Sequence, residues 1–264
     1  MPEPKKVIVY RDELHDDFAD NNIRTKTVPS DFPFAMTNPF WVAAEFIVYR
    51  LIATPLVWLI AKLGFGLRIE NRKVLRKLRH TGFYLYGNHT QTMMDAYTPT
   101  LCAFPHKAHV IVGPDAVSVP GIRSVVQMLG AIPLPSKAGG YPPFLAAQKL
   151  RLRQKRAVAI YPEAHIWPWY TGIRSFPDTS FAYPVSNHVP AVACVTTYRK
   201  RRIFKKLWPL LTVTLSEPFW PDPTVPPKQA RAALRRDVCE FMRQRTSLQD
   251  NYAYYEYRKA SGDE

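Results

Sequence analysis

A histidine and an aspartate six positions apart are the residues in this 264-residue chain that could most readily perform chemistry. His89 and Asp95 occur in the stretch YGNHTQTMMD, directly after the apolar, aromatic run Phe83–Tyr86, which is typical of a buried strand. In open α/β sheets, ligands gather outside the carboxyl ends of the strands. An imidazole has an unperturbed pKa of about 6.5 and can accept a proton near neutral pH. We therefore expect His89 to act as a general base.

A histidine base needs a partner that fixes one tautomer and stabilises the imidazolium, and a carboxylate does both. On one continuous helix, two residues six positions apart lie about 120° from each other around the axis. We therefore expect His89 in a loop and Asp95 in the first turns of the following helix, so that the loop can fold the imidazole back toward the carboxylate. Asn88 can fix this turn through hydrogen bonds from its side chain to the backbone.

The elements that would position these residues alternate along the chain. The sequence predicts strands at Phe83–Tyr86, His109–Val112, Gly130–Leu134, Ala157–Tyr161, Ala191–Tyr198 and Leu210–Leu215. It predicts helices at Asn71–Arg79, Met93–Cys102, Ile122–Leu129, Phe144–Gln154 and after Pro226-Pro227. Alternation of this kind predicts an α/β fold with a mixed, largely parallel sheet flanked by helices.

Composition and charge limit the function classes. Apolar residues make up 47% of the chain and charged residues 22%, which is enough apolar material for a folded core. The net charge of +15 favours polyanionic partners such as nucleic acid, anionic lipid or phosphorylated substrates. Cys102, Cys194 and Cys239 lie far apart without a CxxC spacing, so we expect no structural zinc site and a reducing compartment.

The segment from Pro39 to Leu67 raises the question of a membrane. Its longest uncharged stretch, Leu51–Ala61, is bracketed by Arg50 and Lys62 and contains a proline. This stretch is shorter than the roughly 20 apolar residues that a spanning helix requires. We favour an amphipathic helix, or a bent helical pair, that lies in one leaflet, with a spanning helix or a buried core helix as alternatives.

This organisation divides the chain into three parts. We expect an N-terminal arm at 1–37 with one short strand at Val7–Tyr10, a membrane-associating helical segment at 38–67, and an α/β domain at 68–264. The C-terminal segment Tyr252–Tyr257 is interpreted as a packed surface arm.

The Asn88-His89 pair followed by Asp95 resembles the motif of the glycerolipid acyltransferases, the family of 1-acyl-glycerol-3-phosphate acyltransferases. Five residues separate the histidine from the aspartate here, whereas four are usual in the family. Three later blocks follow in the family's order: Gly130–Pro135 with Lys137 beyond it, Ile160–His165 with a Pro-Glu pair, and Val189–Val195. The resemblance covers about residues 83–198, and residues 161–174 look like a bacterial branch of the family.

The resemblance implies specific roles. His89 would deprotonate the acceptor hydroxyl, and Asp95 would support the histidine. The residues expected to bind substrate are Asn88, Lys137, Glu163, His165 and Arg174. Lys137 and Arg174 are expected to contact phosphate, Arg174 because a guanidinium can bind it in a bidentate manner; the family's Gly-Thr-Arg after Pro-Glu is missing here.

The resemblance further implies transfer of a fatty acyl group from acyl-CoA or acyl carrier protein to a lysophospholipid hydroxyl, in phospholipid biosynthesis. The first-choice acceptor is 1-acyl-glycerol-3-phosphate. We expect no metal or organic cofactor, a peripheral or monotopic position on the cytoplasmic face of the cell membrane, and no nucleic-acid partner.

Two other classes of function stay open. His89, Asp95, Glu163 and His165 could supply metal ligands, so a metal-dependent hydrolase of a lipid or phosphate ester is one alternative. The other is a non-enzymatic protein that binds anionic membranes, since each basic residue near such a surface contributes about 1 kcal/mol.

Overall fold

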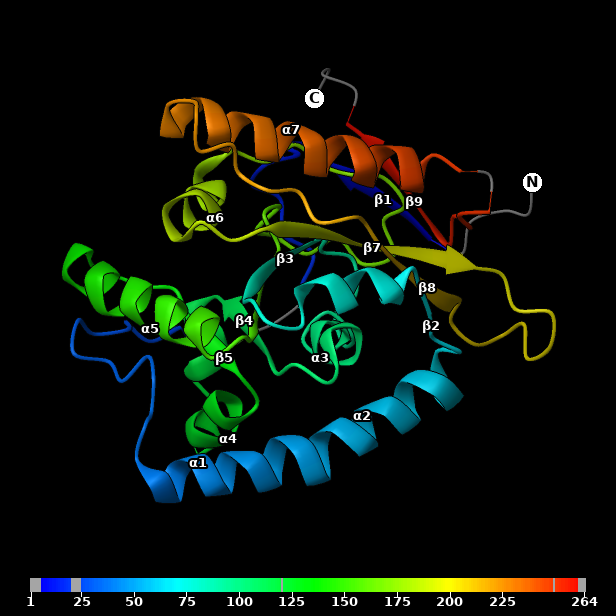
Figure 1. Ribbon diagram of the computed structural model, residues 1–264. Helices are drawn as coiled ribbons and strands as arrows, with labels where there is room; N and C mark the ends of the chain where they lie inside the picture. The colour runs from blue at the N-terminus through cyan, green and yellow to red at the C-terminus, as the bar shows by residue number, and fades with distance from the viewer. Residues whose placement is uncertain (1–5, 20–24, 120, 249, 261–264) are drawn as a thin grey trace.

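A mixed β-sheet forms the centre of the computed structural model, which describes residues 6–19, 25–119, 121–248 and 250–260 (Figure 1). Within these residues the main sheet has seven strands in the order β2-β8-β7-β3-β6-β4-β5. The five strands from β7 to β5 run parallel, and β8 and β2 run the opposite way. The strands are β2 (Arg68–Glu70), β3 (Phe83–Gly87), β4 (Ala108–Val112), β5 (Ala131–Pro133), β6 (Ala157–Ile160), β7 (Ala191–Arg199) and β8 (Leu210–Leu215). The predicted α/β fold with a largely parallel sheet is confirmed.

Helices cover both faces of this sheet (Figure 1). Alternate residues of β3 show why: Phe83 and Leu85 join one apolar cluster, whereas Tyr84 and Tyr86 join another. The first face carries η3 (Arg72–Leu78), α3 (Thr98–Ala103) and α4 (Arg123–Met128), and the second carries α5 (Tyr141–Arg153), α6 (Ala182–Asn187) and α7 (Pro227–Thr246). Short 3₁₀ turns are η4 (Pro114–Val117), η5 (Ala138–Gly140) and η6 (Thr179–Phe181).

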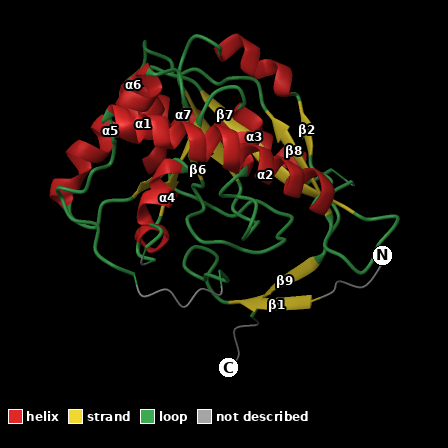
Figure 2. Cartoon of the chain, turned by 90° about the horizontal axis from the view of Figure 1, so that it is seen from below, coloured by secondary structure: helices red, strands yellow, loops and turns green. Residues whose placement is uncertain are grey.

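The two ends of the described chain meet in a separate ribbon. Strand β1 (Lys6–Tyr10), where the sequence predicted a strand, pairs in parallel with β9 (Tyr255–Lys259). Figure 2 shows this ribbon apart from the main sheet. The tail is therefore packed, as expected, but it contains a strand that its sequence did not predict.

A long, gently bent helix runs along the side of the domain opposite α7 (Figure 1). It consists of α1 (Pro39–Phe46), the π-helical turns η1 (Ile47–Ala53), α2 (Thr54–Leu59) and the π-helical turns η2 (Ile60–Gly64). Pro55 has no N–H, and its ring would clash with the carbonyl four residues earlier in a regular α-helix. The wider π register accommodates it: Thr54 donates its backbone N–H to the carbonyl of Tyr49, five residues earlier.

The burial of this helix is the reverse of that of an ordinary surface helix. Polar Glu45, Tyr49 and Thr54 face the domain and are buried, together with Val57 and Ala61. Large apolar side chains face outward: Phe40, Phe46, Ile47, Leu51, Ile52, Leu56, Trp58 and Leu63. By length and composition the stretch Pro39–Gly64 could cross a membrane, with a mean hydropathy of 1.7 and only 22% of its most apolar window buried. An exposed apolar face of this extent is typical of membrane association.

The described part of the N-terminal arm is packed against the domain. Val28, Phe32 and Phe34 are buried in one cluster with Ile132 of β5 and Phe144 of α5. The backbone N–H of Val28 donates to Ser136 Oγ at 2.9 Å. Residues 25–36 therefore close the β5 edge of the sheet.

Candidate active site

The loop after β3 brings His89 and Asp95 into contact. His89 Nδ1 lies 2.8 Å from Asp95 Oδ2. The backbone N–H of Gln91 donates to the same oxygen at 2.9 Å, and the N–H of Asp95 donates to the carbonyl of Gln91 at 3.1 Å. These two bonds fold residues 91–95 into a helical-type turn that returns the carboxylate to the imidazole. The regular helix α3 begins only at Thr98, so the predicted helix start at Met93 was wrong.

The electrostatics of the pair favour a base at Nε2 of His89. Asp95 is 2% exposed, and burial raises the pKa of its carboxyl group, although the hydrogen bond from His89 acts in the opposite direction. A carboxylate at Nδ1 holds the proton on that nitrogen and leaves the lone pair of Nε2 free. The side chain of His89 is 25% exposed and that of Asp95 is 3% exposed, so a substrate can approach the imidazole but not the carboxylate.

Tyr161 at the end of β6 supports the pair from the neighbouring strand. Its ring stacks on the His89 ring with the centroids 4.7 Å apart, and its hydroxyl donates to the backbone carbonyl of Asp95 at 2.6 Å. It also lies where a side chain on Gly87 would sit, since a Cβ built on that glycine would approach the Tyr161 ring to 2.6 Å. The local sequence does not distinguish Tyr161 from other strand residues; the signal that could have identified it is its place directly before the Pro-Glu pair at a strand end.

Glu163 fixes the backbone of the histidine loop. Its Oε2 accepts the N–H of His89 at 2.9 Å, and its Oε1 accepts the N–H of Arg174 at 2.9 Å. It is 4% exposed, and burial raises the pKa of its carboxyl group while Arg174 lowers it. Glu163 therefore joins the loop after β3 to the loop after β6.

Arg174 lies inside this second loop and does not reach the surface. It is 1% exposed, its Nη2 lies 3.4 Å from Glu163 Oε2, and the same nitrogen donates to the backbone carbonyl of His165. Its guanidinium stacks over the Trp167 ring at 4.9 Å. The expectation that Arg174 contacts phosphate therefore needs correction: the guanidinium is enclosed by its own loop.

Residues near both ends of the described chain cover the loop that holds Arg174. Trp167 Nε1 donates to the carbonyl of Asp16 at 2.8 Å, and its ring stacks on Tyr257 of β9 at 4.9 Å. Trp167 is thus fully buried as part of the core. His165 turns toward the arm as well, with Nδ1 3.5 Å from Asp17 Oδ2.

The side chain of Asn88 binds the backbone of the neighbouring strand β7. Its Nδ2 donates to the carbonyl of Thr196 at 3.0 Å, and its Oδ1 accepts the N–H of Thr196 at 2.8 Å. The residue is 1% exposed. Both polar ends therefore anchor the loop to β7 rather than to the backbone of its own turn. The expectation that Asn88 binds substrate needs correction, because both of its polar atoms are used by β7.

Lys137 is exposed and lies beyond β5, the edge strand. Strands β6 and β4 stand between β5 and β3, which leads to His89. The structure therefore does not bring Lys137 to the histidine, although both follow carboxyl ends of parallel strands.

The four residues that could supply metal ligands do not converge on one metal site. Glu163 contacts the backbone of His89 rather than its ring, and His165 turns toward Asp17. In the part of the chain that the structure describes, no group of three or more His, Cys, Asp or Glu side chains is placed to hold a metal ion.

A solved structure shares the fold of this chain. No protein-family model and no curated protein sequence matches the chain. Among solved structures it is similar to the crystal structure of the 1-acyl-sn-glycerophosphate (LPA) acyltransferase PlsC from Thermotoga maritima, with a TM-score of 0.54 and 16% identity. The match covers 82% of this chain and 91% of that chain. At this identity the likeness is one of fold, and the chain therefore has the fold of a glycerolipid acyltransferase, as its motifs predicted.

Proposed function

We propose that this protein is an acyltransferase that moves a fatty acyl group from acyl-CoA or acyl carrier protein to the hydroxyl of a lysophospholipid, with 1-acyl-glycerol-3-phosphate as the first candidate. One observation carries the proposal: the Asp95 carboxylate holds Nδ1 of His89, so that Nε2 is a free base at the carboxyl end of β3. The fold shared with PlsC supports it, because that protein is an LPA acyltransferase.

The reaction follows from this geometry. Nε2 of His89 takes the proton of the acceptor hydroxyl while the oxygen attacks the thioester carbonyl. The tetrahedral intermediate then expels the thiolate, which receives the same proton from the imidazolium. One ester bond forms, one thioester bond breaks, and His89 returns to its starting state. The buried Asp95 carboxylate stabilises the transient imidazolium.

Glu163 and Arg174 act through the position of His89. The carboxylate of Glu163 holds the His89 backbone, and Arg174 holds the carboxylate. Both are positioning residues in this proposal, since neither presents a polar atom to the solvent side of the site.

The same proposal includes a monotopic position on a membrane. The outward apolar face of the Pro39–Gly64 helix is joined by the loop between β7 and β8, where Ile203 and Phe204 are each 73% exposed beside Lys205 and Lys206. The two surfaces adjoin, because Trp208 Nε1 donates to the carbonyl of Gly64 at 3.0 Å. Apolar side chains flanked by lysines suit an interface with anionic lipid.

The test is acyl transfer by the purified full chain, with a long-chain acyl-CoA or acyl carrier protein as donor. Acceptors are lysophosphatidic acid, glycerol-3-phosphate and other lysophospholipids. His89→Ala is compared with His15→Ala, which removes the imidazole of an exposed His–Asp pair whose Nδ1–Oδ2 distance is 2.7 Å.

We expect transfer by the native protein and by His15→Ala, no transfer by His89→Ala at equal melting temperature, and no effect of a chelator. Equal transfer by His89→Ala would remove the histidine from the mechanism. Loss of activity on chelation would favour the metal-dependent hydrolase instead, and absence of transfer to every acceptor would favour a membrane-binding role without catalysis.

A further inference from the structure

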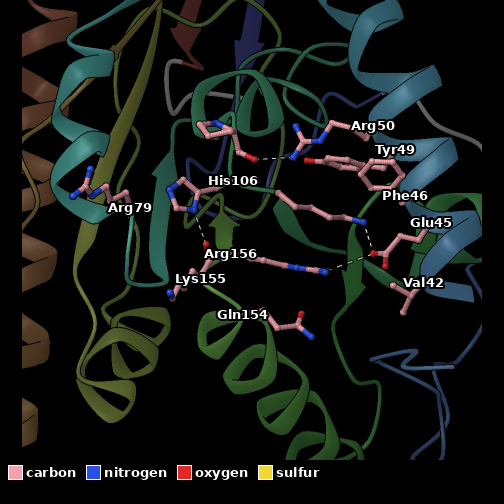
Figure 3. Close-up of a pocket in the computed structure, with 12 residues that line it drawn as sticks. Val42, Glu45, Phe46, Tyr49, Arg50, Arg79, His106, Gln154, Lys155 and Arg156 are labelled. Atoms are coloured by element: carbon pink, nitrogen blue, oxygen red, sulfur yellow. Dashed lines mark hydrogen bonds and ion pairs between the residues drawn. The ribbon is translucent and has the colours of Figure 1, made fainter. Parts of the chain in front are cut away.

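A pocket lies at the amino ends of β4 and β6, whereas His89 follows the carboxyl end of β3. Figure 3 shows the residues that line this pocket. The pocket has a volume of about 410 Å³ and lies between the first half of the long helix and the segments that lead into β4 and β6. Five cationic side chains line it: Arg50, Arg79, Lys107, Lys155 and Arg156. Among the described residues that line it, Glu45 is the acidic one.

This pocket is separate from the catalytic residues. The ring of Phe83, at the start of β3, lies 5.7 Å from that of His106, which lines the pocket. His89 follows Phe83 by six residues, and at about 3.3 Å per residue of extended chain this spacing corresponds to roughly 20 Å. A small group bound in the pocket therefore cannot touch His89.

The positive charge in the pocket exceeds the negative charge that faces it. Glu45 Oε1 contacts Lys107 Nζ and lies 3.7 Å from Arg156 Nη1, so one carboxylate forms ion pairs with two cations. The pKa of Lys107 is lowered to about 8, chiefly by burial; Glu45 opposes this shift, whereas Arg156 and Arg151 contribute to it. Each of these cations would be stabilised by an additional anion.

A neighbouring group shows the same deficit of negative charge. Burial lowers the pKa of His109, and the cations Lys107, Arg151 and Arg156 contribute to the shift. Arg151 is 5% exposed, and no described residue accepts a hydrogen bond from its Nε. Arg151 thus adds a third cation to Lys107 and Arg156 within the electrostatic influence of the single Glu45 carboxylate.

On the wall of the pocket itself, Arg50 has a hydrogen-bond donor that lacks an acceptor. Its Nη2 donates to the carbonyl of Pro105 at 2.7 Å, whereas its buried Nη1 has no partner among the described residues. Leaving a buried donor unpaired destabilises the folded protein. The guanidinium of Arg50 therefore has unused hydrogen-bonding capacity on the wall of the pocket, and guanidinium groups match phosphate geometry.

The pocket also opens onto the apolar face of the long helix. Val42 and Phe46 line it and are 40% and 58% exposed, and the same face continues with Ile47 and Leu51. A ligand that fills the pocket and follows the helix must therefore combine an anionic group with an apolar chain.

We propose that this pocket binds the phosphate of an anionic membrane phospholipid, whose acyl chains lie along the exposed face of the Pro39–Gly64 helix. The basic wall recognises the phosphate, and the apolar side chains of the helix contact the acyl chains. The site would attach the first half of the helix to the membrane at a point distant from His89. It does not depend on the acyl transfer proposed above.

The test uses two cations at the exposed rim, so that the buried pairs are preserved. The full chain carrying Arg79→Gln and Lys155→Gln is compared with a matched control, Arg236→Gln with Arg243→Gln, on α7. Both variants lose two positive charges, but α7 lies on the side of the domain opposite the long helix (Figure 1). Binding to vesicles of phosphatidylcholine, with and without phosphatidylglycerol, is measured by flotation, and melting temperatures verify the fold.

We expect the rim variant to bind phosphatidylglycerol vesicles about 30-fold more weakly than the native protein, at roughly 1 kcal/mol per basic residue. The control variant should bind like the native protein, and binding to neutral vesicles should be equal for all three. Equal losses in both variants, or no loss in the rim variant, would overturn the site.

Soluble anions test whether the ligand of the pocket is a membrane lipid or a free phosphate compound. Inorganic phosphate and glycerol phosphate are added to the native protein without vesicles, and the rise in melting temperature is measured against the rim variant. We expect no rise that depends on Arg79 and Lys155 at concentrations where vesicles are bound. A clear rise of that kind would overturn the assignment to a membrane lipid in favour of a soluble phosphate ligand.

Discussion

The replacement Asp95→Asn tests the proposed mechanism most directly, because it retains the shape of the side chain and removes its charge. When His89 accepts a proton, the imidazolium faces Asp95 Oδ2 at 2.8 Å, and the carboxylate is 2% exposed. Hydrogen bonds to charged groups contribute about 1.5–3 kcal/mol, and each 1.36 kcal/mol changes a rate tenfold. Loss of the charge should therefore slow transfer by about 10- to 150-fold.

The orientation of the new amide decides whether the loss stays in this range. If the amide nitrogen turned toward His89, Nδ1 would have to accept, the proton would move to Nε2, and the loss would approach the roughly 10⁴-fold seen when a catalytic triad adopts the wrong tautomer. The backbone N–H of Gln91 opposes this, because it also donates to the Oδ2 position and requires an acceptor there. We therefore expect the amide oxygen to remain between Gln91 and His89.

The assay is acyl transfer under saturating donor and acceptor. The imidazolium exists only during the reaction, so the change should appear in kcat with KM nearly unchanged. Tautomers of His89 in the native protein and the variant can be compared by nitrogen NMR of the imidazole. Native rates in Asp95→Asn would refute the reasoning, and a loss near 10⁴-fold with the proton on Nε2 would show that the amide turns.

Three further changes test the supports of the site. Glu163→Gln leaves one of two backbone N–H donors, that of His89 or that of Arg174, without its acceptor, so the free energy of unfolding should fall by about 1–3 kcal/mol. When Glu163→Gln is combined with Arg174→Met, the loss should be smaller than the sum of the losses in the two single variants. Denaturant titrations measure both effects. Asn88→Asp places a carboxylate oxygen where the amide donates to the Thr196 carbonyl at 3.0 Å, and calorimetry should show a melting temperature lower by roughly 2–12 °C. Burial raises the folded-state pKa of Asp95 above 3.8. The protonated carboxyl group therefore contributes to stability in full below pH 3.8, and this contribution is lost as the pH rises through the raised pKa. The amide introduced by Asp95→Asn does not titrate, so the melting temperature of this variant relative to the native protein should rise across that range, and a constant difference would contradict the assigned shift.

The strands of the main sheet were predictable because they are apolar on both faces. In β3 and β6 every residue is buried, and such runs stand out from their polar surroundings. The three-residue β2 and the tyrosine-rich β9 lack this signal. They are strands because β8 and β1 present backbone partners to them, and those partners lie far away in the sequence.

The contact between His89 and Asp95 was predictable for a related reason. A spacing of six excludes a shared helical face, and a loop of this length leaves few ways for the carboxylate to meet the imidazole. The contact itself requires the Gln91–Asp95 turn, whose bonds are local in sequence. The catalytic roles of His89 and Asp95 remain predictions that the assays above test.

The position of Arg174 was not predictable from its surroundings in the sequence. An arginine after a strand and a Pro-Glu pair has the same local pattern whether it binds a ligand or a neighbouring carboxylate. Its burial is decided by Trp167, which is covered by Asp16 from the N-terminal arm and by Tyr257 from the tail. Contacts over such separations leave no periodicity to detect.

The orientation of the long helix follows from side chains that hydropathy alone treats as unfavourable. Glu45 is bound to Lys107, and the Tyr49 hydroxyl donates to Thr100 Oγ1 at 2.9 Å, so the polar side of the helix is tied to the domain. To span a bilayer, the helix would have to break these contacts and expose a carboxylate and a hydroxyl to lipid, at a cost of several kcal/mol for the charge alone. Retaining the contacts keeps the helix parallel to the side of the domain, with its apolar face free. We therefore infer that it lies in the plane of the membrane, which agrees with the basic pocket at its first half and the Ile203–Phe204 loop near its end.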